Sequence, residues 1–288
     1  MNPSAVVRWL VPRVVRNWLR RPSQSLARAR HELDHLLGRD PLISPREGWS
    51  FRAHPAARRA FTIPRNDPRQ REELDGFIAW CRPDMVLFDI GAHFGLFSLA
   101  ALHYGGPTAR AIAVEASSSA VRVLQVHARL NQVTDRLRVV HAAATAQPGW
   151  HVMLPVGVIA DGYYIEPDAQ HPASDLVRVP AVTVDGLVEE FGLAPTHLKV
   201  DVEGAEANVL RGARRALTGD QPPWVFLELH NDICRQGGRE PGEALRQLTG
   251  AGYCIESPGG TPMSHEEATR PALIRLVARR PTVQFPAP

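Results

Sequence analysis

Apolar and polar positions follow two alternating patterns along most of the chain. Short continuous apolar runs are typical of strands buried on both faces, and they occur near residues 85–90, 110–115, 137–142, 196–202 and 223–229. Apolar residues at helical spacing occupy the stretches near residues 71–80, 94–104, 117–130, 204–217 and 241–250. This alternation predicts an α/β fold in which helices cover both faces of an open parallel sheet. A last strand, expected at 272–279, need not run parallel to the others.

The amino-terminal part of the chain does not share this alternation. Residues 1–21 have an amphipathic helical pattern, and a second helix is expected from about Ser25 to Leu37. Residues 40–68 contain many prolines and arginines and little periodicity, so we expect a connecting region there. We therefore divide the chain into a basic, helical N-terminal extension with a linker, residues 1–70, and one organised domain, residues 71–288.

One segment inside the organised domain is difficult to assign. Residues 147–185 contain several prolines, Gly157, Gly162 and the adjacent pair Tyr163 and Tyr164. This composition is typical of short strands and long loops, which in a compact domain often have a function. We expect the segment to cover a ligand.

The charge of the chain is unevenly distributed. The net charge is +3 at pH 7, but residues 1–30 contain seven arginines and no acidic residue. The rest of the chain is slightly acidic. The folded body therefore lacks the overall basic character that nucleic-acid binding requires, and no nucleic-acid partner is expected.

The sequence contains no apolar run that approaches the roughly 20 residues of a membrane-spanning helix. Arginines interrupt the apolar pattern of residues 1–21, so this segment is not a typical signal peptide. It can make peripheral contact with an anionic membrane, or it can pack on the domain or on a second subunit. The three cysteines, Cys81, Cys234 and Cys254, lack disulfide or zinc spacing, which favours a cytoplasmic location.

The first motif with chemical content runs from Val86 to Gly95 and reads VLFDIGAHFG. It predicts a strand that carries an acid, Asp89, and a glycine-rich turn to the start of a helix, at the sheet edge where α/β proteins bind ligands. Gly91 is expected to let the backbone approach a ligand closely. Asp89 can accept hydrogen bonds from a cationic group such as the methionine ammonium of S-adenosylmethionine.

A second acid, Glu115, ends the next predicted strand, 24 residues after Gly91. A carboxylate at this position can accept hydrogen bonds from two ribose hydroxyls, so the two acids suit an adenosine ligand. Dinucleotide-binding enzymes share this layout, but His93 stands where their fingerprint has the glycine that admits a pyrophosphate. S-adenosylmethionine has no phosphate, and we expect it to be bound by Asp89, Gly91, His93, Gly95 and Glu115.

The second motif runs from Leu198 to Ala213 and reads LKVDVEGAEANVLRGA, with VTVDGL before it and FLELH after it. In these segments the sequence resembles the FkbM family of methyltransferases. With the two earlier motifs, the resemblance covers about residues 80–280 and leaves out the first 70. It implies a Rossmann-like class I methyltransferase fold, with a mostly parallel seven-stranded sheet. It also implies methyl transfer from S-adenosylmethionine, commonly to oxygen on sugars or small metabolites, in secondary-metabolite or glycan biosynthesis.

The residues that follow two of the predicted strands suggest how such a reaction would be catalysed. If the strands at 196–202 and 223–229 are neighbours, their carboxyl ends bring four side chains towards one cleft: Asp201, Glu203, Glu228 and His230. A hydroxyl is a poor nucleophile while it is protonated. We expect His230 to act as general base, because its ordinary pKa of about 6.5 lies near working pH. Asp201 could instead take the proton or orient the histidine, and Glu203 could hold acceptor hydroxyls.

Other roles for these side chains are also open. Asp201, Glu228 and His230 could together hold a divalent metal, although no dense ligand spacing identifies such a site and we do not favour it. Glu206 stands at a helix start, where an acid stabilises the helix dipole without any catalytic role, and we prefer that explanation. Lys199, the single lysine of the chain, is expected to pair with a nearby acid.

Two further classes of function compete with a methyltransferase. The first is a nicotinamide-dependent oxidoreductase of the same fold. The second is a protein that binds S-adenosylmethionine, a nucleotide or a membrane surface without catalysis. The sequence does not identify the acceptor, which we expect to be a small molecule or a sugar, and it does not identify the oligomeric state.

Overall fold

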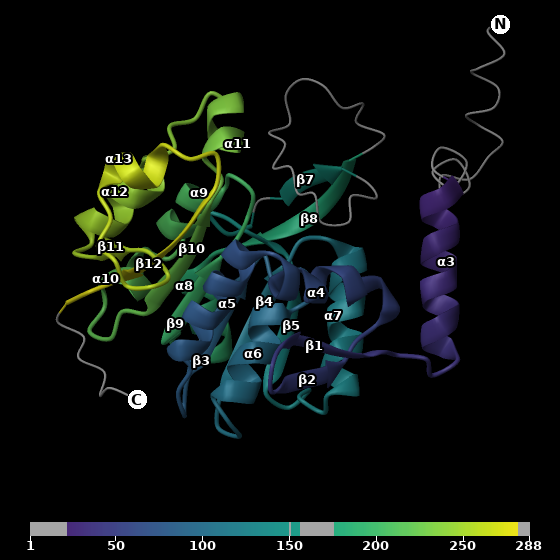
Figure 1. Ribbon diagram of the computed structural model, residues 1–288. Coiled ribbons are helices and arrows are strands. Elements are labelled where there is room, and N and C mark those ends of the chain that lie inside the picture. The colour runs from purple at the N-terminus through teal and green to yellow at the C-terminus, as the bar shows by residue number, and fades with distance from the viewer. Residues whose placement is uncertain (1–21, 150, 156–175, 282–288) are drawn as a thin grey trace, which may run out of the picture.

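The computed structural model describes residues 22–149, 151–155 and 176–281. Within these residues the chain forms a layered α/β domain around a central sheet, as Figure 1 shows. No helix among the described residues is long and apolar enough to cross a membrane. Residues 1–21, with the predicted amphipathic pattern, lie outside the described range, so their membrane contact stays a prediction.

The central sheet has seven strands in the order β11-β12-β10-β9-β3-β4-β5. Only β12 runs antiparallel to its neighbours. The predicted class I methyltransferase fold is thereby confirmed, and the last strand, whose direction the sequence left open, runs antiparallel. The strands are β3 (Val86–Ile90), β4 (Arg110–Glu115), β5 (Leu137–His141), β9 (His197–Val200), β10 (Trp224–Leu229), β11 (Cys254–Glu256) and β12 (Ile274–Arg279).

The strands are apolar without interruption because helices cover both faces of the sheet. In β3, Leu87 and Phe88 are both fully buried, and they belong to different hydrophobic clusters, one on each face. One face is covered by α4 (Arg58–Asn66), α5 (Pro68–Ala79), α6 (Leu96–Tyr104) and α7 (Ser118–Leu130). The other face is covered by α8 (Val184–Phe191), α9 (Glu206–Arg211), α10 (Arg214–Thr218) and α12 (Glu243–Gly250).

The prediction that residues 40–68 form an irregular connecting region is wrong. This segment forms β1 (Leu42–Arg46), β2 (Trp49–Arg52), the short 3-10 helix η1 (Pro55–Ala57) and α4. Trp49, Phe51 and Phe61 are buried in the same cluster as α5 and α6. The prediction failed because the apolar residues that anchor this segment are few and separated by prolines and arginines. The helix expected at Ser25 to Leu37 is present as α3 (Pro22–Leu36), at one side of the domain in Figure 1.

The segment 147–185 contributes to a second, three-stranded sheet. Its strands are β6 (Ala143–Ala144), β8 (Leu176–Val182) and β7 (His151–Pro155), in this order. Tyr163 and Tyr164 lie outside the described residues, so the expected ligand cover is not tested. The described residues also form two short helices, α11 (Asn231–Gln236) and α13 (His265–Thr269).

Candidate functional site

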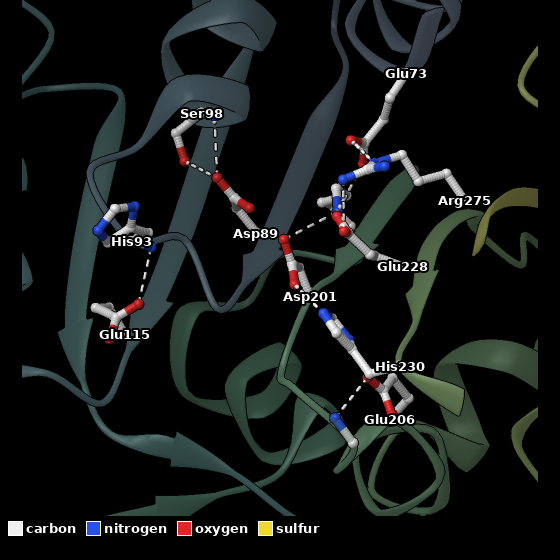
Figure 2. Close-up of polar contacts among 12 residues, drawn as sticks. Glu73, Asp89, His93, Ser98, Glu115, Asp201, Glu206, Glu228, His230 and Arg275 are labelled. Carbon is white, nitrogen blue, oxygen red and sulfur yellow. Dashed lines mark hydrogen bonds and ion pairs between the residues drawn. The ribbon is translucent and has the colours of Figure 1, made fainter. Parts of the chain in front are cut away.

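Both motifs singled out from the sequence lie at the carboxyl edge of the parallel strands. The predicted neighbours β9 and β10 are paired in parallel, and β9 also pairs with β3. The turns that follow β3, β4, β9 and β10 therefore meet at one edge (Figure 2). We call the first half of this site the cofactor edge: it comprises Asp89, Gly91, His93, Gly95 and Glu115.

Asp89 is enclosed within the cofactor edge. Its side chain is 2% exposed, and its Oδ2 accepts hydrogen bonds from the Ser98 backbone N–H at 3.0 Å and the Ser98 hydroxyl at 2.6 Å. Since Ser98 lies in the first turn of α6, the carboxylate caps that helix from the strand. Burial raises the pKa of Asp89 to about 6, although the Ser98 bonds act in the opposite direction. Its contact with a ligand ammonium stays a prediction.

The two glycines of the turn, Gly91 and Gly95, allow close packing of the protein itself, whereas the sequence suggested close approach of a ligand. Gly91 has φ of 80°, and a Cβ there would lie 1.8 Å from the backbone oxygen of Asp201. Close approach of the segment that follows β9 therefore requires glycine at this position, whether or not a ligand also lies here. Gly95 has φ of 86°, and a Cβ there would meet the Leu124 side chain at 2.2 Å, so this glycine allows α6 and α7 to pack.

His93 and Glu115 are joined by a direct contact. The His93 backbone N–H donates to Glu115 Oε2 at 2.8 Å, and the Ser117 N–H donates to Oε1 at 2.6 Å. His93 adopts φ of 49°, a left-handed conformation that glycine adopts more easily. Burial raises the pKa of Glu115 against these hydrogen bonds. Each carboxylate oxygen keeps a second lone pair that can accept from a ribose hydroxyl, so the donor and acceptor set fits an adenosine ligand.

The second half of the site is a group of charged side chains, which we call the ion-pair cluster. It comprises Glu73, Lys199, Asp201, Glu228, His230 and Arg275. Figure 2 labels all of them except Lys199. Lys199 is 1% exposed, and its Nζ lies 3.0 Å from Glu73 Oε1, 3.7 Å from Asp201 Oδ2 and 3.9 Å from Glu228 Oε2. The predicted pairing of this lysine with an acid is thus confirmed.

The antiparallel strand β12 supplies the second buried cation. Arg275 lies opposite Glu228 in the β10–β12 register, and its Nη2 donates to Glu228 Oε1 at 2.6 Å. Its Nε donates to Glu73 Oε2 at 2.5 Å. Glu73, on α5, is therefore shared between both cations. Such a network satisfies buried charges that would each be costly alone.

The surroundings within the cluster raise the pKa of one carboxyl group, Glu228, and lower the pKa of another, Asp201. Burial, together with the charges of Asp201 and Glu73, raises the pKa of Glu228 to about 8. Burial acts the same way on Asp201, but Lys199 and His230 outweigh it and lower its pKa. With a side chain 34% exposed, Asp201 is also the most open acid of the cluster. Asp201 is therefore a charged carboxylate at the solvent-accessible side of the cluster.

His230 does not have the ordinary acid strength on which its predicted role was based. It follows β10, and its Nε2 lies 3.8 Å from Asp201 Oδ1. Burial alone would lower its pKa, but a hydrogen bond with Glu206 and the charges of the nearby carboxylates raise it to about 9. At neutral pH the imidazole is therefore mostly protonated, and it must lose a proton before it can act as a base.

Glu203 does not lie where the sequence suggested. β9 ends at Val200, so Asp201 and Glu203 do not share a strand face. Glu203 instead lies in the turn before α9, with φ of 54°. This left-handed backbone is uncommon for a residue with a side chain. Its proposed contact with acceptor hydroxyls stays a prediction.

Comparison with known proteins agrees with this geometry. Residues 89–255, more than half of the chain, match the family described as "Methyltransferase FkbM domain". The chain belongs to the FkbM methyltransferase family. The matched residues contain the whole cofactor edge and, from the ion-pair cluster, Lys199, Asp201, Glu228 and His230.

The individual proteins that match share less than a third of their aligned residues with this chain. The chain is 29% identical over 130 residues to a ribosomal protein L11 methyltransferase of Desulfitobacterium hafniense, which covers 42% of this chain and 41% of that protein. A solved FkbM methyltransferase from Methylobacillus flagellatus KT matches with a TM-score of 0.45 and 18% identity, over 68% of this chain and 43% of the other. The Aeropyrum pernix fibrillarin structure with bound S-adenosyl-L-methionine matches with a TM-score of 0.37 and 13% identity. This match covers 69% of this chain and 67% of the fibrillarin chain. The chain thus spans less than half the length of the first two.

The FkbM domain brings together the three residues considered as metal ligands. One ligand atom each from Asp201, Glu228 and His230 lies within 4.8 Å of the others. However, Lys199 and Arg275 already contact two of these carboxylates, and their charges would repel a divalent cation. This donor set fits an ion-pair network better than a metal site.

Several residues of the site were not predicted. Ser98, on the next helix, donates hydrogen bonds to Asp89, and Glu206 forms a hydrogen bond with His230 rather than only stabilising a helix dipole. Glu73 and Arg275 lie outside the matched FkbM domain and complete the cluster from α5 and β12. The abundance of arginine in this sequence hides such a residue, whereas the rarity of lysine made Lys199 conspicuous.

Proposed function

We propose that this protein transfers a methyl group from S-adenosylmethionine to a hydroxyl group of a small metabolite or sugar. The observation that carries the proposal is the contact between the two halves of the site. The Asp201 backbone N–H donates to the Ile90 carbonyl at 2.9 Å, and its carbonyl oxygen occupies the space beside Gly91. A cofactor on the glycine turn and an acceptor at the cluster would therefore be neighbours.

The cofactor edge would hold S-adenosylmethionine chiefly through Glu115 and the backbone of the glycine turn. Glu115 would accept hydrogen bonds from the ribose hydroxyls, as its position at the end of β4 favours. The cofactor supplies an activated methyl group, so the protein must orient the acceptor and manage its proton.

Proton removal would fall to His230 or Asp201. At neutral pH the Asp201 carboxylate can accept a hydrogen bond from the acceptor hydroxyl, while His230 is mostly protonated. If His230 is the base, the reaction rate should rise with pH up to about 9, because the neutral imidazole becomes more abundant. If Asp201 is the base, the rate should be flat over this range.

Incubation of the full chain with methyl-labelled S-adenosylmethionine and separate pools of sugars, other polyols and amines tests the proposal. Mass spectrometry of the products should find methyl ethers from a hydroxylated pool. Transfer should fall about 100-fold or more in His230→Gln if this residue is the base. Methylation confined to the amine pool would contradict O-methylation. Hydride exchange with a nicotinamide cofactor instead would contradict the proposed activity.

A further inference from the structure

Glu206 is buried in a way that a simple helix-start acid is not. It is the first residue of α9, yet it is only 1% exposed. Its Oε1 accepts a hydrogen bond from the Gly204 backbone N–H at 2.8 Å and lies 2.8 Å from His230 Nδ1 (Figure 2). An acid that served only the helix dipole would need neither enclosure nor an imidazole partner.

The backbone before α9 is shaped to make this contact. Glu203 and Gly204 have φ of 54° and 93°, so two successive residues adopt the left-handed conformation. This turn directs the Gly204 N–H to the carboxylate of Glu206. A Cβ at Gly204 would lie 2.8 Å from Ile233 Cγ2, which ties the turn to α11 and hence to the segment that carries His230. Uncommon backbone conformations of this kind are often found at functional sites.

The contact determines which way the imidazole faces. A carboxylate can only accept, so His230 Nδ1 must be the nitrogen that carries a proton towards Glu206. The other nitrogen, Nε2, then faces Asp201 Oδ1 at 3.8 Å. A carboxylate behind an imidazole fixes both its tautomer and its orientation, as in the catalytic triads of hydrolases.

We propose that Glu206 is a positioning residue: it holds His230 with Nδ1–H towards itself and Nε2 towards the acceptor beside Asp201. Its part in the reaction rests on the function proposed above, whereas the pairing itself does not. The same pairing raises the pKa of His230, so Glu206 also sets the pH at which the imidazole becomes neutral.

NMR titration of the histidine side chains in the full chain tests the pairing without any methyl acceptor. The chain has 12 histidines, and the signal that disappears in His230→Gln identifies the one of interest. In Glu206→Gln the pKa of His230 should fall by about one unit or more, because the amide keeps a hydrogen-bond acceptor but loses the charge. Glu206→Asp, which restores the charge on a shorter side chain, should recover part of this shift.

The same variants should change the reaction in a way that lost stability would not. In Glu206→Gln the rising limb of the pH–rate profile should move to lower pH, and the rate constant at saturation on the high-pH plateau, where His230 is neutral in both proteins, should fall roughly 10- to 100-fold. Glu266→Gln is the matched control, since Glu266 lies exposed in the first turn of α13. It should leave the His230 titration and the reaction unchanged.

The outcomes separate the pairing from the reaction. An unchanged His230 titration in Glu206→Gln would overturn the positioning role whatever the activity. A lowered pKa together with an unmoved pH–rate profile would overturn its part in the reaction. If Glu206→Gln lowers the pKa of His230 but the unaltered protein transfers no methyl group, the pairing is supported and the proposed function is contradicted. If Glu206→Gln does not fold, the tautomer of neutral His230 in the unaltered protein, read from the nitrogen chemical shifts of its ring, tests the same pairing. A proton on Nδ1 supports the positioning role, and a proton on Nε2 would overturn it.

Discussion

The cofactor edge and the ion-pair cluster lie against each other, but their buried charges are stabilised by different means. At the cofactor edge Asp89 and Glu115 accept hydrogen bonds from Ser98, His93 and Ser117, which are at most 22 residues away along the chain. In the ion-pair cluster the bond between Glu73 and Arg275 spans 202 residues. The first half is thus built from short-range turns, whereas the second requires most of the domain to be folded.

This difference has an energetic consequence. A backbone N–H near a strand end is supplied by the turn itself, and only a substitution by proline removes it. A buried carboxylate in the cluster depends on cations from β9 and β12, and loss of one cation leaves it without compensation. Substitutions should therefore be more costly in the cluster than among the hydrogen bonds of the cofactor edge.

The largest effect is expected at Lys199. Lys199→Met removes the cation that contacts Glu73 and Glu228, and it should lower the free energy of unfolding by about 4 kcal/mol. Denaturant unfolding of the two proteins measures this difference. Arg246→Gln breaks an exposed pair with Glu240 and should leave the unfolding midpoint unchanged. If both substitutions have an equally small effect, the claim that substitutions cost more stability in the ion-pair cluster than at the cofactor edge is contradicted.

A substitution at the contact between the halves should come next. Gly91→Ala places a Cβ against the Asp201 carbonyl in a left-handed backbone, and it should cost about 3 kcal/mol of unfolding free energy. Gly106→Ala is a matched control, because Gly106 also has a positive φ, of 76°, but no atom within 4 Å of the added Cβ. Its cost should be only about 1 kcal/mol. Equal costs would show that the contact with Asp201 is not tight.

The protonation of His230 gives the cluster a pH dependence. Its folded pKa of about 9 lies above the ordinary 6.5, so its stabilising effect is complete below pH 6.5 and is lost as pH rises through about 9. The loss should be roughly 3 kcal/mol, at about 1.4 kcal/mol for each unit of pKa difference. Unfolding of the protein and of His230→Gln at pH 6, 7.5 and 9 measures it, and a parallel decline in both would refute the assignment.

The smallest effect is expected at the cofactor edge. Ser98→Ala removes one of the two hydrogen bonds to Asp89, and it should cost about 1 kcal/mol. Because this bond favours the charged carboxylate, its removal should raise the pKa of Asp89 above about 6. The variant should therefore lose more stability at pH 7 than at pH 5, where Asp89 is mostly neutral. Thermal unfolding at both values compares them.

The same difference explains how much of the molecule the sequence predicts. The strands at β3, β4 and β10 and the two acids Asp89 and Glu115 follow from local patterns, because a continuous apolar run can be recognised in the sequence without knowledge of its partner strands. The hairpin of β1 and β2 was missed, since its stability comes from Trp49 and Phe51 packing on distant helices.

Within the site, most of the missed residues make contacts that no local pattern shows; Glu73 and Arg275, for example, are 202 residues apart. Glu206 and His230 are 24 residues apart, and the contact depends on a turn whose left-handed backbone no local pattern predicts. The acid strength of His230 could not be predicted for the same reason. It depends on Glu206, Asp201 and Glu228, which only the folded sheet edge brings to the imidazole.

Calorimetric titration with S-adenosylmethionine is the most direct test of the central claim, that the cofactor edge binds this ligand. The full chain should bind S-adenosylmethionine and not NAD. Glu115→Gln should weaken the binding about 10-fold or more, because the ribose hydroxyls lose a charged acceptor. Absence of binding to the folded protein, or equal binding by the folded Glu115→Gln variant, would contradict the account.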